Sequence, residues 1–227
     1  MTSGSLLAFR RGVLEVDELQ RADPTPIGAP PAIPEVTRVI GRASVVLLSS
    51  HFERYVYAIN EEAIQLINDT GISGLELSEE MRLLHSQPVV DGLIATSWER
   101  RGKQLTTLIN EEAWLWAQVG SGLLDHDRLI EWMKAPTPKN LMRYFRYWGI
   151  KDVFEAITRA SHTKSELWLR IDELVRKRNN IAHGDLTTEA THADIVSYRD
   201  ATTRFSERVD RKFGAVVGKL IGHQAAW

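Results

Sequence analysis

The chain has 227 residues, 43% of them hydrophobic and 26% charged, which is the balance of an ordinary globular protein. Its 28 basic and 30 acidic side chains leave a net charge of -2, which argues against a general polyanion binder but allows a local basic patch. The absence of cysteine excludes disulfides, thiolate zinc sites, iron–sulfur clusters and cysteine nucleophiles. Because no long apolar run and no secretory signal pattern is found, we expect a cytoplasmic protein without a membrane partner.

Residues 1–34 are predicted to form a helical arm followed by a proline-rich connector. Apolar residues recur with a loose helical spacing between Gly4 and Ala22. Five of the eight prolines then fall between Pro24 and Pro34, a composition typical of a stiff extended connector. We expect the arm to pack on the main body or on a partner, and we assign residues 35–227 to one helical domain.

This domain begins with a long helix, predicted from Pro34 to about Asp69. Its apolar residues recur at intervals of three and four, and Gly71 and Gly74 are placed to end it. At 1.5 Å per residue, about 35 residues make a rod of roughly 50 Å, which suits an elongated bundle.

Several shorter helices are predicted in the middle of the chain. Ser78 is placed to cap the first of them. The clearest start is at residues 137–138, where a threonine cap precedes a proline in the first helical position. The others are predicted over residues 97–118, 126–134 and 151–159. No segment shows the alternation of a strand or a hairpin turn, so the predicted fold class is all-α.

Two further helices are predicted to complete the chain. Ser165 is placed to cap the first, and Gly184 to end it. Its predicted apolar face consists of Trp168, Ile171, Leu174, Val175 and Ala182. Thr191 and Asp194 make a weak capping-box signal for the final long helix.

The stretch that points to chemistry is RKRNNIAHG, residues 176–184, at the end of the penultimate helix. Asparagine is a mediocre helix former, and such a local cost often marks a functional site. At about 100° per residue, Asn179 and His183 lie on the same helix face. Arginine binds phosphate oxygens with a fixed fork of donors, and histidine transfers protons near neutral pH. The alternative is structural, because cations and histidine also favour the negative end of a helix dipole.

Arg178-Asn179-x-x-x-His183 matches the motif of HEPN ribonucleases, so the sequence resembles that family. Two further segments, Ser49 to Ala63 and Pro136 to Ile157, resemble a bacterial subfamily of single-domain HEPN-like nucleases. The resemblance implies an elongated all-α bundle of the HEPN type with additional short helices. It also implies a homodimer that pairs through the helices bearing the motif.

For the mechanism, the resemblance implies a metal-independent endoribonuclease with no cofactor. His183 would handle protons while the neighbouring 2′-hydroxyl attacks the phosphorus. Arg178 would bind the phosphate and stabilise its developing charge, and Asn179 would orient the histidine or the phosphate. The expected products are a 2′,3′-cyclic phosphate and a free 5′-hydroxyl. The implied role is that of a toxin or defence effector, with an antitoxin or a defence-system protein as partner.

Four more residues are predicted to belong to the site. Glu53 and Asn180 are candidate supporting residues. The carboxylate of Glu53 could position a catalytic side chain across the bundle. A purely structural ion pair is an equal alternative for Glu53. Residues 159–183 contain six arginines or lysines against three acids, which predicts a basic patch for RNA. Arg176 and Lys177 are therefore candidate RNA-binding residues.

Other interpretations stay open at this point. The chain could be a non-catalytic HEPN module that binds RNA, nucleotide or a partner subunit, or a helical assembly subunit whose arm docks on a neighbour. The His126-Asp127 doublet resembles that of metal-dependent phosphohydrolases, but that chemistry needs further ligands and we expect no metal site. Aromatic residues alternate with arginines over residues 143–148, which favours an amphipathic core helix over a base-stacking surface.

Overall fold

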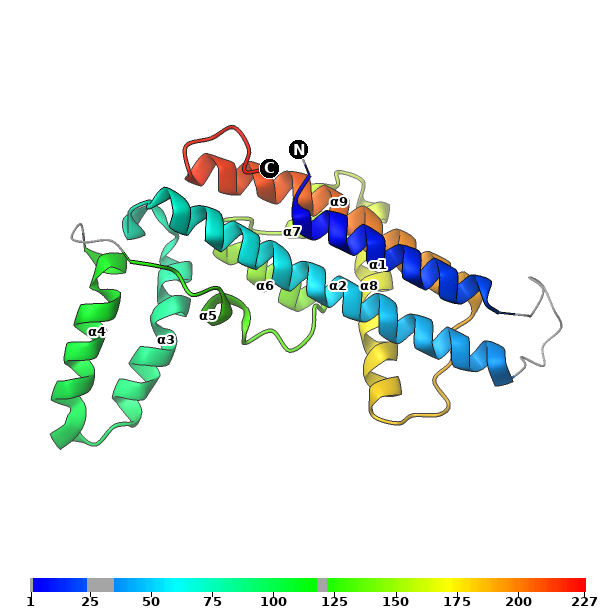
Figure 1. The fold of residues 1–227 in the computed structure, drawn as a ribbon, viewed down its shortest axis with the longest axis horizontal. Coiled ribbons are helices and arrows are strands. Elements are labelled where there is room, and N and C mark those ends of the chain that lie inside the picture. Colours follow the sequence, from blue (N-terminus) through cyan, green and yellow to red (C-terminus); the bar gives the residue numbers. More distant parts are fainter. Residues whose placement is uncertain (1, 24–34, 118–121) are drawn as a thin grey trace.

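The structure, a computed structural model, describes residues 2–23, 35–117 and 122–227, and over these ranges every regular element is a helix (Figure 1). The elements in chain order are α1 (Gly4–Arg21), α2 (Glu35–Thr70), the 3₁₀ turn η1 (Gly74–Glu76), α3 (Glu79–Ala95), the 3₁₀ turn η2 (Trp98–Arg100), α4 (Arg101–Trp116), α5 (His126–Ile130), α6 (Pro138–Tyr147), α7 (Val153–Ile157), α8 (Ser161–Ala182) and α9 (His192–Leu220). The predicted all-α fold class is confirmed.

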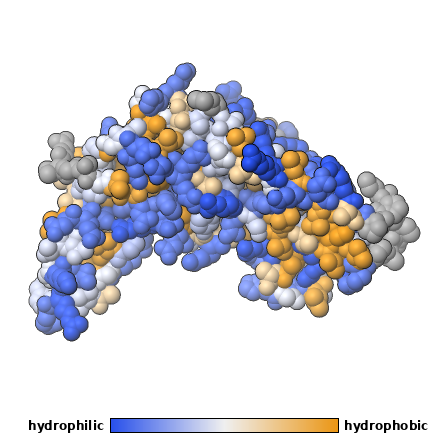
Figure 2. Space-filling model, viewed as in Figure 1, coloured by the Kyte–Doolittle hydropathy of each residue, from blue (hydrophilic) through white to orange (hydrophobic). Residues whose placement is uncertain are grey.

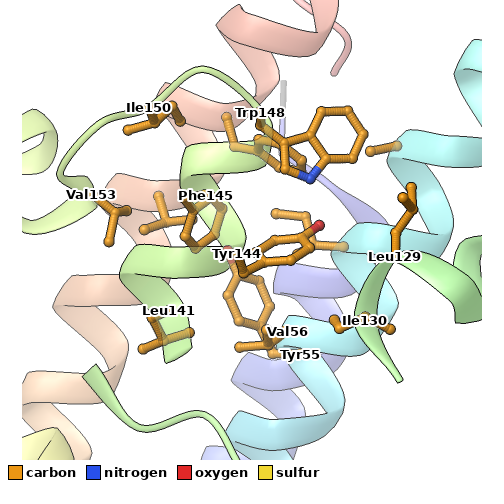
Figure 3. Close-up of a cluster of buried hydrophobic side chains, with 14 of the residues drawn as sticks. Tyr55, Val56, Leu129, Ile130, Leu141, Tyr144, Phe145, Trp148, Ile150 and Val153 are labelled. Carbon is orange, nitrogen blue, oxygen red and sulfur yellow. The ribbon is translucent and has the colours of Figure 1, made fainter. Parts of the chain in front are cut away.

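Three helices, α1, α2 and α9, run side by side along the long axis of the molecule, and α8 packs across α2 and α9 (Figure 1). The main core lies where α6 packs on α2, with Tyr144 and Phe145 fully buried beside Tyr55 and Val56 (Figure 3). A smaller core joins α1, α2, α8 and α9 near the end of α8, and its members are Val16, Val45, Leu48, Leu174, Ile195 and Tyr198. The end of α8 therefore packs against this smaller core.

Helix α1 is attached to the body by polar contacts as well as apolar ones. The hydroxyl of Ser3 donates to the buried carboxylate of Asp210 on α9. The backbone amide and hydroxyl of Ser5 both donate to Glu62 on α2, at 3.1 and 2.7 Å. The proline-rich connector predicted over residues 24–34 lies outside the described residues.

Most of the predicted helix ends are confirmed. Thr137 caps α6 by accepting from the amide of Asn140, with proline in the first helical position. Thr191 and Asp194 form the expected capping box at the start of α9. Gly71 follows α2 with a φ of +63°, a conformation that favours glycine.

The predicted start of the penultimate helix is wrong. Helix α8 begins at Ser161 with Ala160 in the capping position, and Ser165 is already inside the helix. The ammonium of Lys164 lies 2.7 Å from the carboxylate of Asp152, the residue that caps α7. This tertiary ion pair stabilises the first turn of α8, which therefore forms without a side-chain cap.

Three other expectations differ from the structure. Ala182 is exposed, whereas its neighbour Ile181 packs against the smaller core. Helix α3 was expected to be short, yet it continues through Pro88, which lies at an exposed position. The helices predicted over residues 126–134 and 151–159 are only five residues long, His126–Ile130 and Val153–Ile157.

The α3–α4 hairpin projects from one end of the long axis, and its base is fixed by a buried polar network (Figure 1). Glu112 contacts His85 Nδ1 at 3.0 Å and Arg128 Nη1 at 2.6 Å. The amide of Asp125 donates to His85 Nε2 at 2.9 Å. Burial by itself would raise the pKa of Glu112, but the hydrogen bonds from His85 and Arg128 prevail and lower it.

The described helices do not meet the requirements of a membrane span. None of them is both long enough and apolar enough to cross a membrane.

Candidate nucleic-acid site at the end of helix α8

The predicted catalytic residues lie in the last turns of α8 and in its cap. Arg178 and Asn179 are half-buried, whereas His183 is exposed in the C-cap position. The amide of His183 still donates to the carbonyl of Asn179 at 2.9 Å, so the imidazole follows directly on the helix. Gly184 then takes a φ of +84°, which ends α8 at this point.

Arg178 is oriented by two neighbours. Its Nη2 donates to Glu53 Oε2 on α2 at 3.3 Å, and its Nη1 donates to Asn179 Oδ1 at 3.2 Å. The side chains of Arg178 and Glu53 are 29% and 25% exposed, so solvent reaches the pair. The other N–H groups of the guanidinium have no partner among the described residues and are available to an anion.

His183 and Asn180 differ from Arg178 in having side chains without partners. Neither side chain makes a hydrogen bond or an ion pair with any residue that the structure describes. The backbone carbonyl of Asn180 accepts from the amide of Asp185 at 3.0 Å, which belongs to the turn after the helix. The structure thus groups Glu53, Arg178 and Asn179 by direct contact, and leaves the His183 imidazole open to a ligand.

The two candidate RNA-binding cations are placed differently. Lys177 Nζ lies 3.1 Å from Asp194 Oδ2 and donates to the carbonyl of Glu189 at 2.7 Å. Partial burial by itself would lower the pKa of Lys177, but the hydrogen bond to Asp194 prevails and raises it. Arg176 is exposed and has no partner in the described part of the chain. Arg176 is therefore free to meet a phosphate, whereas Lys177 fixes the start of α9.

Two residues that the sequence analysis missed fix the loop between α8 and α9 onto α2. Arg42 Nη1 donates to the carbonyls of Asp185 and Thr188, at 2.6 and 2.8 Å. At Gly41 a Cβ would collide with the carbonyl oxygen of Ala190. A glycine inside a helix is a weak signal of such a close approach, and nothing in the sequence marks the arginine.

The same loop carries a fixed negative charge. The carboxylate of Asp185 accepts hydrogen bonds from the hydroxyls of Thr188 and Thr187 and from the amide of Thr187, at 2.6, 2.7 and 2.8 Å. These hydrogen bonds lower the pKa of Asp185 to about 2. Because this carboxylate is two residues from His183, the surroundings of the motif are not uniformly basic.

An apolar patch adjoins the motif. Val36 and Val39 on the first turns of α2 are 53% and 54% exposed, and Leu186 on the loop is 77% exposed. Figure 2 shows hydrophobic side chains gathered over this part of the molecule. Monomeric proteins seldom expose a large contiguous apolar patch, so this end of the molecule has the character of an interface.

Metal chemistry and base stacking were the other readings of the sequence. Within the described ranges no three histidine or acidic side chains are close enough together to bind a metal ion. His126 Nδ1 lies 3.2 Å from the carboxylate of its neighbour Asp127, at the start of α5. The amphipathic interpretation of α6 is confirmed, because Leu141, Tyr144 and Phe145 are completely buried.

Comparison with known families gives one result. The sequence model of the family described as HEPN_RiboL-PSP, or RiboL-PSP-HEPN, matches residues 15–215. This range begins within α1, ends within α9 and includes the whole motif. No curated protein matches the chain, and no solved structure does.

Proposed function

Because the chain belongs to the RiboL-PSP-HEPN family, we propose that it is an endoribonuclease that cleaves RNA without a metal ion. The observation that supports this most directly is the arrangement at the end of α8. There Arg178 is oriented by Glu53 and Asn179, and the exposed His183 imidazole has no partner among the described residues.

In the proposed reaction the 2′-oxygen attacks the adjacent phosphorus, and the bond from phosphorus to the 5′-oxygen breaks. His183 accepts the proton of the 2′-hydroxyl, and an imidazolium returns a proton to the leaving 5′-oxygen. Arg178 binds the non-bridging oxygens with the N–H groups that Glu53 and Asn179 do not use. The products are a 2′,3′-cyclic phosphate and a 5′-hydroxyl. Arg176 contributes a phosphate contact nearby.

The active form in this proposal is a homodimer joined at the end of α8. In one protomer His183 is exposed at the C-cap of α8. Pairing through the apolar patch of Val39 and Leu186 would bury that patch and bring a second imidazole to the same groove. One imidazole could then accept a proton while the other donates.

The test is cleavage of RNA by the purified protein in excess chelator. We expect cyclic-phosphate ends from the wild type, and a loss of rate of about 100-fold or more in His183→Ala and Arg178→Ala. The matched control is His162→Ala, because His162 is an exposed histidine in the first turn of the same helix. Cleavage by His183→Ala at the wild-type rate would refute the proposal.

The biological part of the proposal is a toxic effector in a defence or toxin–antitoxin system, restrained by a partner protein. Expression of the wild type should arrest growth, and expression of His183→Ala to the same level should not. Arrest by both proteins would show that toxicity does not depend on the motif.

A second candidate is a non-catalytic module that binds RNA or a partner subunit. Its protein-binding form is favoured by the carboxylates of Glu53 and Asp185, which reduce the positive charge around Arg178 and His183 and so oppose the binding of a polyanion. Binding of RNA without any cleavage, unchanged in His183→Ala, would select this candidate.

A further inference from the structure

The α3–α4 hairpin exposes an apolar face that no described segment covers. From residue 87 to residue 111 not one side chain is buried, so the outer half of the hairpin has no core of its own. Figure 1 shows the hairpin projecting clear of the rest of the chain. The outer halves of its two helices therefore contact essentially each other and solvent.

Two hollows lie along the exposed face, and together they are called the groove. Its first part has a volume of about 590 Å³ and is lined mainly by Leu83, Val90, Leu108, Ile109 and Trp116. A second hollow of about 540 Å³ lies at the tip and is lined mainly by Leu93, Ile94, Trp98 and Leu105. One helical turn separates Val90 from Ile94 and Ile109 from Leu105, so the two hollows follow each other along both helices.

The side chains along this groove are large and strongly exposed. Ile94, Trp98 and Ile109 are 66%, 77% and 56% exposed. Within each helix the residues that line the two hollows recur at intervals of four and seven, which is the spacing of a face that packs against other helices. Two helices alone bury little apolar surface, whereas four helices enclose a common core. The hairpin thus has the surface of half a four-helix bundle.

We propose that the groove is closed by the same hairpin of a second copy, the two hairpins packing face to face and antiparallel as a four-helix bundle. The charges along the hairpin favour this occupant. Its tip carries Arg100 and Lys103, besides Arg101 beside the Trp98 ring, against the one acid Glu99, and its base begins with Glu79 and Glu80.

An antiparallel pair places each basic tip over the acidic base of the other copy, whereas a parallel pair would bring like charges together. The cations at the base are occupied by aromatic rings. Arg82 lies 4.9 Å from the centre of the Trp116 ring, and Arg143 lies 4.2 Å from that of Trp132. The hairpin is therefore complementary to itself, as a two-fold symmetric interface requires.

This contact is separate from the homodimer proposed at the end of α8, which lies elsewhere along the molecule (Figure 1). A protein with both interfaces would associate beyond a dimer. Because the two surfaces share no residue, each can be removed without the other, and the two proposals can fail independently.

The experiment measures the mass of the full chain in solution by sedimentation velocity. In a Val39→Glu background, which disrupts the patch beside the motif, we expect a dimer formed by the hairpins. Adding Ile109→Glu should give a monomer. Adding Asn110→Glu instead should leave the dimer, because Asn110 is exposed and lies about 100° further round the helix, away from the groove.

Circular dichroism should show the same helix content for all of these proteins. A Val39→Glu protein that is already monomeric would overturn the hairpin contact, and so would a dimer that persists with Ile109→Glu. If the groove instead binds a helix of a different protein, the Val39→Glu protein should already be a monomer.

A charge exchange tests the antiparallel arrangement. Neither Arg100 nor Glu80 has a partner in the described part of the chain. In the same background, Arg100→Glu or Glu80→Arg alone should raise the dissociation constant of the hairpin dimer roughly five-fold. The double variant should recover most of the wild-type affinity. A double variant weaker than either single one would overturn the tip-to-base pairing.

Discussion

The end of α8 and the α3–α4 hairpin both project from the bundle, but they are stabilised in different ways. At the end of α8, Glu53 orients Arg178, and Arg42 fixes the loop that follows the helix. In the hairpin, the buried polar network ends at the base, where Glu112 binds His85 and Arg128. Beyond that network no side chain is buried, and large apolar side chains such as Ile94, Trp98 and Ile109 are exposed.

This difference indicates that the end of α8 and the α3–α4 hairpin are suited to different functions. Chemistry on a phosphate needs donors whose positions are set before the substrate arrives, and the end of α8 supplies them. Association needs apolar area that water leaves easily, and the hairpin supplies that. Four variants would break or sharpen this contrast.

The largest effect is expected at the base of the hairpin. Glu112→Ala removes a buried carboxylate and leaves Arg128 and His85 without their partner. We expect the free energy of unfolding to fall by about 3 kcal/mol, measured by urea denaturation. The neighbouring exposed Glu111→Ala is the control and should change it little. Cleavage of RNA by the folded Glu112→Ala protein should stay near the wild-type rate, and a large loss would show that the two projections are coupled.

The second largest effect, a fall in kcat for RNA cleavage, is expected at the motif. Glu53→Gln keeps a hydrogen-bond acceptor beside Arg178 but removes the charge. We expect kcat for RNA cleavage to fall about ten-fold with little change in KM, because the guanidinium is bound less firmly in position. The control is Glu61→Gln on the same helix, where Glu61 lies 2.8 Å from Arg54. A Glu53→Gln protein with the wild-type kcat would assign the pair a purely structural role.

A smaller effect, on the free energy of unfolding and its pH dependence, is expected where α8 meets the start of α9. Burial by itself would raise the pKa of Asp194, but hydrogen bonds from Thr191 and Lys177 prevail and lower it below its ordinary value of 3.8. The pair therefore contributes stability above this value and loses it as the pH falls through the lowered pKa.

Because Asp194 is partly exposed, Asp194→Asn should cost only about 0.5 kcal/mol at pH 7. The difference from the wild type should shrink below about pH 4, which urea denaturation at several pH values would show. A difference that grows on acidification would contradict the assignment.

The smallest effect is expected at the tip of the hairpin. Trp98 is 77% exposed, and its ring lies 5.7 Å from the guanidinium of Arg101. Trp98→Ala should change the free energy of unfolding of the monomer by less than about 0.5 kcal/mol, measured at a concentration too low for association. A loss of several kcal/mol would show that the tip has a core after all.

The sequence predicts those parts of the molecule whose signals are local. The starts of α6 and α9 follow from caps within a few residues, and the cluster of Arg178, Asn179 and His183 lies within one helix end. The predicted reach of Glu53 across the bundle is matched by its contact with Arg178, although the role of that contact is untested.

The parts that the sequence does not predict depend on contacts between distant segments. Helix α8 starts before Ser165 because Lys164 meets Asp152 on another helix. Nothing in the sequence around Gly41 indicates that the carbonyl of Ala190 approaches it closely. The network of His85 and Glu112 has no characteristic spacing, because its members come from separate helices.

The left-handed turn at Gly184 has an evolutionary consequence. The imidazole of His183 owes its exposed position to a neighbour that takes part in no reaction and has no side chain to lose. Any larger residue there would favour a different backbone path and carry the histidine with it. Under the proposed function, a lineage could therefore lose activity while Arg178, Asn179 and His183 all stayed in place, and an inventory of those residues alone would not detect the loss.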